Sequence, residues 1–333
     1  MTSDLELDRA RAQAKVDHVI SRSQYEKRLN ANDEDRSAKD PVLLELLRDF
    51  GLQRLLVPPD FPIEFADFLR RLSIELKVVP APVFPQRLVK TPAEIEYIRQ
   101  SIQAAEKSME AAIAALRQAT VEDRVLRLGG EVLTSERVRR LIHQVLLEED
   151  CLGLHTIVAG GENGCDPHQE GSGPLRPDEP IVIDIFPRNS TNGYFGDLTR
   201  TVVKGEAPTS VVDLYNAVHR GQQWALGQIG AGVDGRQIHQ GILKMFEEAG
   251  YKTGSREGRM QGFFHGTGHG LGLEIHEPPR ISSMGDKLAS GQVVTVEPGL
   301  YYPGLGGVRI EDVVVVRDNG CENLTTFPHF LVV

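Results

Sequence analysis

The stretch IVIDIFPRNSTNGYFGDLTRTVV (residues 181–203) places two aspartates inside runs of apolar and β-branched residues. Asp184 lies within IVIDIF and Asp197 directly precedes LTRTVV, and both runs have the composition of buried strands. A carboxylate buried in a strand costs several kcal/mol unless it is paired or bound to a cation. The two aspartates therefore need a positively charged partner.

The same conflict recurs in two later strand-like runs. Glu297 lies in VVTVEPG (293–299) and Glu311 lies in VRIEDVVVV (308–316). A salt-bridged core carboxylate would explain any one of the four acidic residues. Basic residues near these runs are few, namely Arg188, Arg200 and Arg309. A pair of divalent metal ions explains the four acidic residues together.

The imidazoles that could join such a site lie in HGTGHGLGLEIHE, which contains His265, His269 and His276. His265 and His269 have the spacing of a helical metal pair, but the glycines between them indicate an irregular backbone close to a ligand. The alternative is a flexible glycine loop with incidental histidines. His168, in the turn-rich stretch 159–173, could donate to a substrate carbonyl or oxyanion, or could be an exposed loop histidine.

Several carboxylates with one imidazole suit manganese, cobalt or zinc. Two such ions about 3.5–4 Å apart would share a water and lower its pKa to near neutrality. The sequence therefore predicts a dinuclear hydrolase that forms no covalent intermediate.

Composition excludes several other classes of protein. The chain has 333 residues and a formal net charge of -10, which disfavours nucleic acid and anionic membranes as partners. No stretch approaches the ~20 apolar residues of a membrane span, and the charged N-terminus does not resemble a secretory signal. Cys151, Cys165 and Cys321 are few and widely separated, so we expect no disulfide framework and a cytoplasmic location.

The chain divides at a cluster of prolines, Pro80, Pro82 and Pro85. Residues 1 to about 40 are charged, and are either partly helical or loosely docked. A small α/β unit follows, with strands at 54–57 and 76–79 and a helix at 62–73. Beyond the prolines, two helices followed by strands occur twice, which predicts two similar halves that share one central sheet. The expected helices cover 91–116, 135–149, 209–228 and 234–250, and the strands 155–160, 181–186, 292–302 and 307–316.

Four segments of the sequence together resemble those of a known family. The segments 184–201, 265–277, TVEPGLYY (295–302) and GVRIED (307–312) resemble those of the creatinase/aminopeptidase P/methionine aminopeptidase superfamily, metallopeptidase family M24. The resemblance implies an α+β pita-bread catalytic domain over residues 86–333, with residues 1–85 as a reduced creatinase-like α/β domain. It favours the Xaa-Pro peptidase branch, because an N-terminal domain, the ENGCDPH motif and all three histidines of residues 265–277 are present.

The resemblance also implies roles for individual residues. The metal ligands would be Asp184, Asp197, His269, Glu297 and Glu311, with Asp197 and Glu311 as bridges. The catalytic residues would be His168, His265, His276, Glu297 and Arg309. Here Glu297 would also serve as general base, the histidines would orient substrate and stabilise the tetrahedral intermediate, and Arg309 matches an arginine of the proline-specific branch.

The chain departs from the family pattern in two places. Asp184 and Asp197 are thirteen residues apart, about two more than usual, and we expect a hairpin at NSTNG (189–193) to absorb the difference. The stretch SDLELDRARAQAKVD (3–17) resembles the middle of the family's larger N-terminal domain, so we expect the first strands of that domain to be absent.

The expected function is hydrolysis of the Xaa-Pro bond in short peptides, as an aminopeptidase or a dipeptidase, by a metal-bridging hydroxide. The cofactors would be two divalent ions, manganese first, with cobalt or zinc as alternatives. The partners would be peptides with proline in the second position and a second copy of the chain in a homodimer. The alternatives are a non-catalytic peptide- or protein-binding module, a creatinase-like amidinohydrolase and a methionine aminopeptidase.

Overall fold

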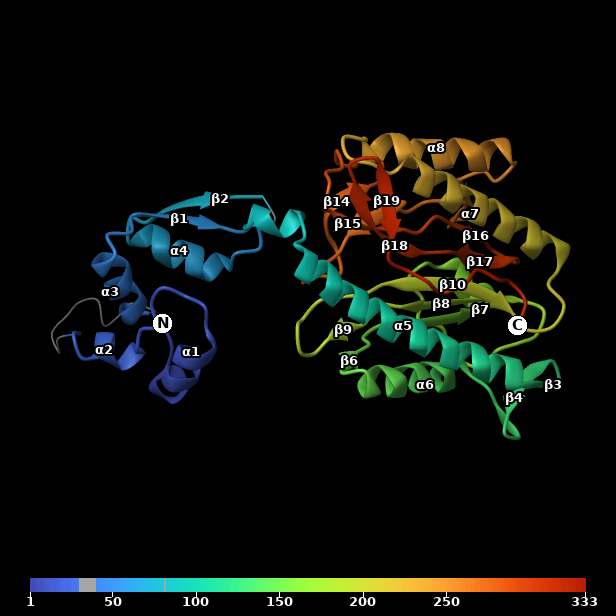
Figure 1. Ribbon diagram of the computed structural model, residues 1–333, viewed down its shortest axis with the longest axis horizontal. Helices are drawn as coiled ribbons and strands as arrows, with labels where there is room; N and C mark the ends of the chain where they lie inside the picture. The colour runs from blue at the N-terminus through green and yellow to red at the C-terminus, as the bar shows by residue number, and fades with distance from the viewer. Residues whose placement is uncertain (30–39, 81) are drawn as a thin grey trace. The chain divides into compact units, whose positions relative to one another are not determined.

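A computed structural model describes residues 1–29, 40–80 and 82–333. The chain forms two compact units, Met1–Phe84 and Pro85–Val333 (Figure 1). Among the described residues, no helix combines the length and apolar character that crossing a membrane requires. The assignment of the first unit as a reduced creatinase-like domain stays a prediction.

The first unit contains a parallel βαβ arrangement. Strands β1 (Arg54–Val57) and β2 (Glu75–Val78) pair in parallel, and α4 (Ile63–Arg71) connects them. A small core formed by Leu47, Phe68 and Leu69 joins α4 to α3 (Pro41–Asp49). The expected strands and helix are confirmed here. Residues 1–29 include η1 (Asp4–Glu6), α1 (Leu7–Gln13) and α2 (Arg22–Glu26), so that part is helical, whereas residues 30–39 lie outside the described residues.

The second unit begins with a long amphipathic helix. Helix α5 (Pro92–Gln118) has the expected capping box, in which the Thr91 side chain accepts from the Glu94 N–H while the Glu94 carboxylate accepts from the Thr91 N–H. Its apolar stripe packs with α6 (Ser135–Glu148) against strands β7 (Ile157–Gly160), β8 (Pro180–Ile185) and β10 (Leu198–Val203). Strand β7 starts two residues later than expected, because His155 has a φ of 58°, which a strand does not accommodate.

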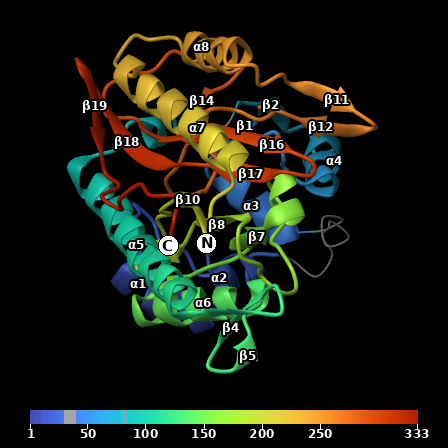
Figure 2. The ribbon, with the colours of Figure 1, turned by 90° about the vertical axis from the view of Figure 1, so that its right-hand side faces the viewer.

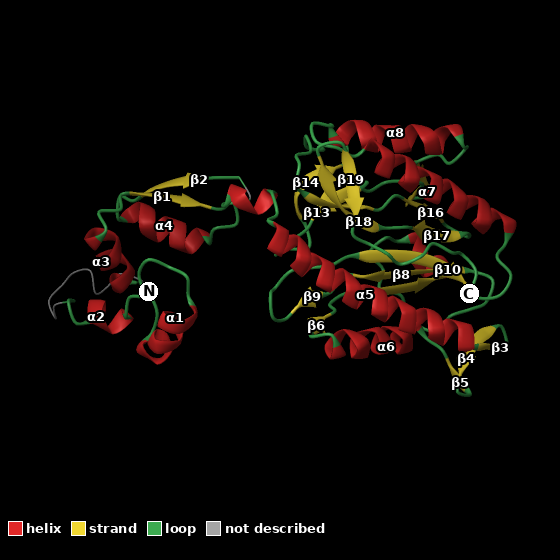
Figure 3. Ribbon diagram, in the orientation of Figure 1, coloured by secondary structure: helices red, strands yellow, loops and turns green. Residues whose placement is uncertain are grey.

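The second half repeats the order of two helices followed by strands. Helices α7 (Thr209–Gln228) and α8 (Gly235–Glu248) share a second apolar core with β14 (Glu277–Ile281), β15 (Val293–Val296), β16 (Gly299–Tyr302), β17 (Gly306–Arg309) and β18 (Asp312–Arg317). In Figure 2, α5 and α6 lie on one side of the strands, with α7 and α8 on the other. Figure 3 shows the same arrangement, with strands between the helices. The predicted α+β repeat is confirmed.

The expectation of one continuous central sheet is wrong. Strands β10-β8-β7 form one antiparallel ladder, β16-β17 form a second, and β14-β13-β15-β18-β19 form a third, with β13 at Gly268–Gly270 and β19 at Gly320–Asn323. The expected strand 292–302 breaks at Glu297-Pro298, where proline has no N–H for a ladder. The partner strand breaks at the same level. Val296 pairs with Asp312 and Gly299 pairs with Arg309, so Ile310 and Glu311 lie opposite Glu297 and Pro298 and belong to neither ladder. Both glutamates of the predicted site lie at this shared break.

The turn between Asp184 and Asp197 has the form expected of a short hairpin. The Asn189 side chain accepts from the backbone N–H groups of Thr191 and Asn192, and the Gly193 N–H donates to the Asn189 carbonyl. Gly193 has a φ of 81°, a conformation that glycine adopts without steric cost. The longer interval is thus taken up in the turn, and β8 and β10 remain paired beside the two aspartates.

Smaller elements complete the second unit. They are η3 (Pro85–Leu88), β3 (Thr120–Glu122), β4 (Val125–Leu128), β5 (Glu131–Val132), β6 (Cys151–Leu152), η4 (Gly161–Cys165), β9 (Arg188–Asn189), β11 (Gly254–Arg256) and β12 (Arg259–Gln261).

We expect Gly196→Ala to destabilise the protein by about 1–3 kcal/mol, the usual cost of overpacking. A Cβ at residue 196 would lie 2.5 Å from the backbone carbon of Ser101 in α5, so the segment that carries Asp197 would have to move. The matched control is Gly227→Ala, at an exposed position of α7 where an added Cβ meets nothing within 4 Å. That change should stabilise α7 by about 0.5–1 kcal/mol. Urea unfolding of both variants tests this account, and equal stability would contradict it.

Candidate metal centre

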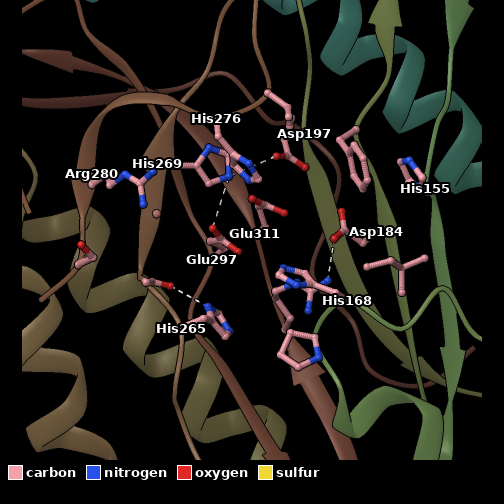
Figure 4. A pocket seen from close by; sticks show the side chains of 18 of the residues that line it. His155, His168, Asp184, Asp197, His265, His269, His276, Arg280, Glu297 and Glu311 are labelled. Atoms are coloured by element: carbon pink, nitrogen blue, oxygen red, sulfur yellow. Dashed lines mark hydrogen bonds and ion pairs between the residues drawn. The ribbon is translucent and has the colours of Figure 1, made fainter. Parts of the chain in front are cut away.

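All nine residues that the sequence predicts for the site line one pocket of the second unit, with a volume of 560 Å³. Asp184 lies in β8, His269 in β13 and Arg309 in β17, and the other six lie in loops or breaks next to strands. Figure 4 shows the carboxylates of Asp184, Asp197, Glu297 and Glu311 around the centre of the pocket, beside the His269 ring. The nine are Asp184, Asp197, His269, Glu297, Glu311, His168, His265, His276 and Arg309.

Three of these residues already have the spacing of metal ligands. One donor atom each from Asp197, His269 and Glu311 lies within 4.8 Å of the others. His269 Nε2 lies 3.8 Å from Asp197 Oδ2 and 3.5 Å from Glu297 Oε1. The other ring nitrogen, Nδ1, lies 3.1 Å from the Gly270 carbonyl oxygen, which can only accept a hydrogen bond. Nδ1 therefore carries the proton, and the Nε2 lone pair is directed at the carboxylates.

Asp184 has one paired oxygen and one free oxygen. Arg309 donates to Asp184 Oδ2 at 2.6 Å, and both side chains are buried. Asp184 Oδ1 is also buried but accepts no hydrogen bond from any residue that the structure describes. A buried carboxylate oxygen without a donor is costly, and a cation in the pocket would remove that cost.

Glu311 is held by its neighbours from both sides. The Thr199 hydroxyl donates to Glu311 Oε2 at 2.7 Å, and Arg200 donates to the Glu311 carbonyl at 2.6 Å. Arg200 is itself buried and pairs with Asp312 at 2.8 Å. These contacts fix both the backbone and the carboxylate of Glu311.

The carboxylates repel one another when no cation is present. Burial and the charges of Glu311 and Asp184 raise the pKa of Asp197 well above its ordinary value. Burial, together with Glu297 and Asp184, does the same to the pKa of Glu311. Burial raises the pKa of Glu297 to about 8, although Arg309 opposes this shift. Burial lowers the pKa of His269 to about 3, so its imidazole is neutral, as a metal ligand must be.

The protein itself uses both ring nitrogens of His265. Arg309 donates to the Tyr301 hydroxyl at 2.9 Å, so the Tyr301 proton is free to point to His265 Nε2, also 2.9 Å away. His265 Nδ1 then donates to the Gly266 carbonyl at 2.7 Å. Burial lowers the pKa of His265 to about 3, so the ring is neutral and has no further N–H. In this arrangement His265 orients Tyr301 and Arg309 and has no proton to give a substrate.

His276 and His168 remain as donors that could reach a substrate. Both line the pocket, and the His276 ring packs edge-on against the His269 ring at a centroid distance of 4.4 Å. The structure thus brings all nine predicted residues together. His265 differs from His168 and His276 because both of its ring nitrogens are hydrogen-bonded within the protein.

Several residues that support the site were missed by sequence reasoning, namely Thr199, Arg200, Tyr301, His155, Glu170 and Arg280. Arg200 is recognisable in the sequence only as a basic residue near the acidic runs. Thr199, Arg200 and Thr201 are consecutive polar residues in an otherwise apolar buried strand, which is the one local signal for Thr199 and Arg200.

The donor set fits a divalent metal pair. It has four buried or half-buried carboxylates and one neutral imidazole with a free lone pair, and one buried carboxylate oxygen accepts no hydrogen bond from the residues that the structure describes. Carboxylates with one imidazole are ligands that manganese, cobalt and zinc accept.

Comparisons with known proteins agree with this chemistry. The profile of "Metallopeptidase family M24" matches residues 96–318. The chain is 32% identical to an Xaa-Pro dipeptidase of Pyrococcus furiosus over 253 residues, which is 75% of this chain and 67% of the relative.

Solved structures of Xaa-Pro peptidases resemble nearly the whole chain. An Xaa-Pro dipeptidase from Bacillus anthracis has a TM-score of 0.79 and 27% identity, covering 100% of this chain and 85% of that one. An X-Pro aminopeptidase from Thermotoga maritima has a TM-score of 0.77 and 27% identity, covering 99% and 86%.

We expect the metal-free protein to lose stability as the pH rises from 6.5 to 8. The native state keeps a proton on Glu297 up to a pKa of about 8, whereas the unfolded chain loses it near 4.5. The native state therefore binds more protons across this interval, and its free energy of unfolding falls by up to about 1.4 kcal/mol per pH unit. Asp197 and Glu311 act in the same direction. The neutral histidines add no slope above their ordinary value of 6.5.

Urea unfolding of chelator-treated protein at several pH values measures this slope. The control is Glu297→Gln, which has no titrating carboxyl and should give a shallower slope. Saturating Mn²⁺ should remove most of this slope, because metal binding displaces the protons and leaves the native and unfolded carboxylates equally deprotonated. Stability that rises with pH in the metal-free protein would contradict the account.

Proposed function

This chain belongs to metallopeptidase family M24, and from that premise we propose that it hydrolyses the Xaa-Pro bond of short peptides with two divalent metal ions. Membership confirms the resemblance read from the sequence, the pita-bread fold and the assignment as a peptidase. The observation that carries the finer proposal is the convergence of five ligand-type side chains on one pocket, with Asp197, His269 and Glu311 within 4.8 Å of one another.

We propose that Asp184, Asp197, His269, Glu297 and Glu311 hold the two ions, with manganese as the first candidate and cobalt or zinc as alternatives. When bound, two divalent ions lower the pKa of a water to near neutrality and so supply hydroxide for attack on a carbonyl. Four carboxylates balance the charge of two such ions. Asp184 Oδ1, which accepts no hydrogen bond from any described residue, would bind an ion, and Arg309 would keep the other oxygen of that carboxylate in place.

The remaining residues would bind and orient the peptide. His276 and His168 would donate to the carbonyl oxygen before proline, where negative charge develops. Glu297 would accept a proton from the attacking water and return it to the departing proline nitrogen. A bond to proline has no N–H, so this site needs no acceptor there. The histidines and the apolar side chains of Ile157, Pro167 and Phe186 line the pocket.

Both a dipeptidase and an aminopeptidase are among the similar proteins. The preference of this chain for dipeptides or longer peptides is measured by the assay below. A homodimer and a cytoplasmic location remain predictions.

A direct test compares Xaa-Pro dipeptides, Xaa-Pro-Yaa tripeptides and matched Xaa-Ala peptides with added Mn²⁺ or Co²⁺. We expect hydrolysis before proline and much slower hydrolysis of the alanine peptides. The ratio of kcat/KM for the two proline substrates separates the dipeptidase from the aminopeptidase. No hydrolysis of either by metal-loaded protein would overturn the proposal.

A second test replaces one proposed bridging ligand. We expect Glu311→Ala to lose bound metal and to lower kcat/KM by more than about 100-fold, since even an outer-shell change costs about 10- to 100-fold. The fold should be retained, because the change also removes a mutually repelling carboxylate. Metal content by mass spectrometry and circular dichroism check both points. The control is Glu322→Ala, which removes an exposed ion-paired carboxylate from β19. Full activity in Glu311→Ala would refute the dinuclear assignment.

A further inference from the structure

The residue directly after His276 is a buried glutamate with two cationic partners. Glu277 begins β14 and is 6% exposed, and Lys90, which is 5% exposed, donates to Glu277 Oε2 at 3.2 Å. Arg87 donates to the other oxygen, Oε1. A buried carboxylate and a buried ammonium each carry a large desolvation cost. Removing one of them leaves the other as an uncompensated buried charge, which is strongly destabilising. The three charges therefore fix one another in place.

The same carboxylate organises the loop that carries His276. Residues 271–276, between β13 and β14, belong to no helix or strand. Glu277 Oε1 accepts from the Glu274 N–H at 3.0 Å, and the Gly272 N–H donates to the Glu274 carbonyl at 3.0 Å. A Cβ at residue 272 would lie 3.0 Å from Glu277 Oε2, so the loop passes directly over the carboxylate. Glu277, directly after the C-terminal end of the loop, thus stabilises the loop conformation through its carboxylate.

The two cations reach this loop from a distant part of the sequence. Arg87 and Lys90 lie in the first residues of the second unit, just beyond the boundary at Phe84 and Pro85. The Lys90 backbone N–H also donates to the Gly291 carbonyl at 2.9 Å, so the segment is attached through its backbone as well as through its charge. None of these three side chains lines the pocket, whereas His276 does.

We infer that Glu277, clamped by Lys90 and Arg87, is a positioning residue that holds His276 at the angle from which its imidazole reaches the scissile carbonyl. This inference rests on the proposed function, because it takes His276 to contact the peptide. The clamp acts on the histidine loop and leaves the metal ligands in place. Its loss therefore lowers kcat, because the donor is misplaced in the transition state, with little change in KM or in bound metal. A misplacement of about 1 Å costs on the order of 100-fold in rate.

The experiment is a double-mutant cycle on the metal-loaded full chain, with an Xaa-Pro peptide as substrate. Glu277→Gln keeps the size of the side chain and removes its charge, and we expect it to lower kcat by about 10- to 100-fold. In a His276→Ala background the same change should have no further effect, because residues that act as one unit are not additive. The matched control is Glu322→Gln, an exposed ion-paired glutamate that should leave kcat unchanged.

Arg87→Met provides a second, milder variant, because Arg87 is 29% exposed in its side chain and its loss leaves Lys90 paired with Glu277. It should lower kcat in the same direction by a smaller factor. Amide hydrogen exchange of residues 271–277 provides a readout that needs no activity, and we expect faster exchange in Glu277→Gln and Arg87→Met than in the control.

Four results would each overturn the inference. They are an unchanged kcat in Glu277→Gln, an equal loss in the His276→Ala background, loss of bound metal, and unchanged exchange in residues 271–277. A wild-type protein that binds two metals but cleaves no Xaa-Pro peptide would refute the proposed function instead, and faster loop exchange in the variants would then still support the clamp.

Discussion

The repulsion among four carboxylates enclosed in one pocket is the constraint on which the rest of the second unit depends. Asp184, Asp197, Glu297 and Glu311 lie in or directly beside strands that are buried almost throughout. Arg309 is the one cation that pairs directly with any of them among the described residues, and it reaches Asp184. Without further positive charge, burial and mutual repulsion raise the pKa values of Asp197, Glu297 and Glu311. Such a site is costly unless a cation binds there, so the arrangement is best understood as a metal centre.

The fold makes this arrangement possible by interrupting its own ladders. Pro298 ends β15, and the paired strand breaks opposite, so that Glu297 and Glu311 leave the ladder at the same level. The Glu297 N–H donates to the Thr267 carbonyl and the Glu311 N–H to the Thr199 carbonyl, so the N–H groups of both glutamates have partners outside the β15–β18 ladder. The two helix-covered halves supply rigid walls, and the ligands come from both. The loss of regular strand pairing at this level therefore places the two glutamates in the pocket.

Much of this could be predicted from the sequence, because an acidic residue in a buried strand is a local signal. The four acidic ligand candidates, the capping box at Thr91 and the hairpin at 189–193 each depend on neighbours within a few positions. His269 is distinguished from His265 and His276 only by the resemblance to the family. What could not be predicted depends on partners far along the chain. Thr199 meets Glu311 and Arg87 meets Glu277 across more than a hundred residues. His265 was expected to contact substrate, and only its distant partner Tyr301 shows that both ring nitrogens are already used. The break at Pro298 could have been predicted from the proline itself.

The pocket therefore combines a rigid set of carboxylates with histidines held by two different networks, one through Tyr301 and Arg309 and one at the loop closed by Glu277. The most direct test of the central claim is a crystal structure of the protein grown with Mn²⁺, with anomalous scattering measured at the manganese edge. The account predicts two peaks about 3.5–4 Å apart among Asp184, Asp197, His269, Glu297 and Glu311. A pocket without any peak, with these side chains unchanged and ion-free at saturating manganese, would contradict it.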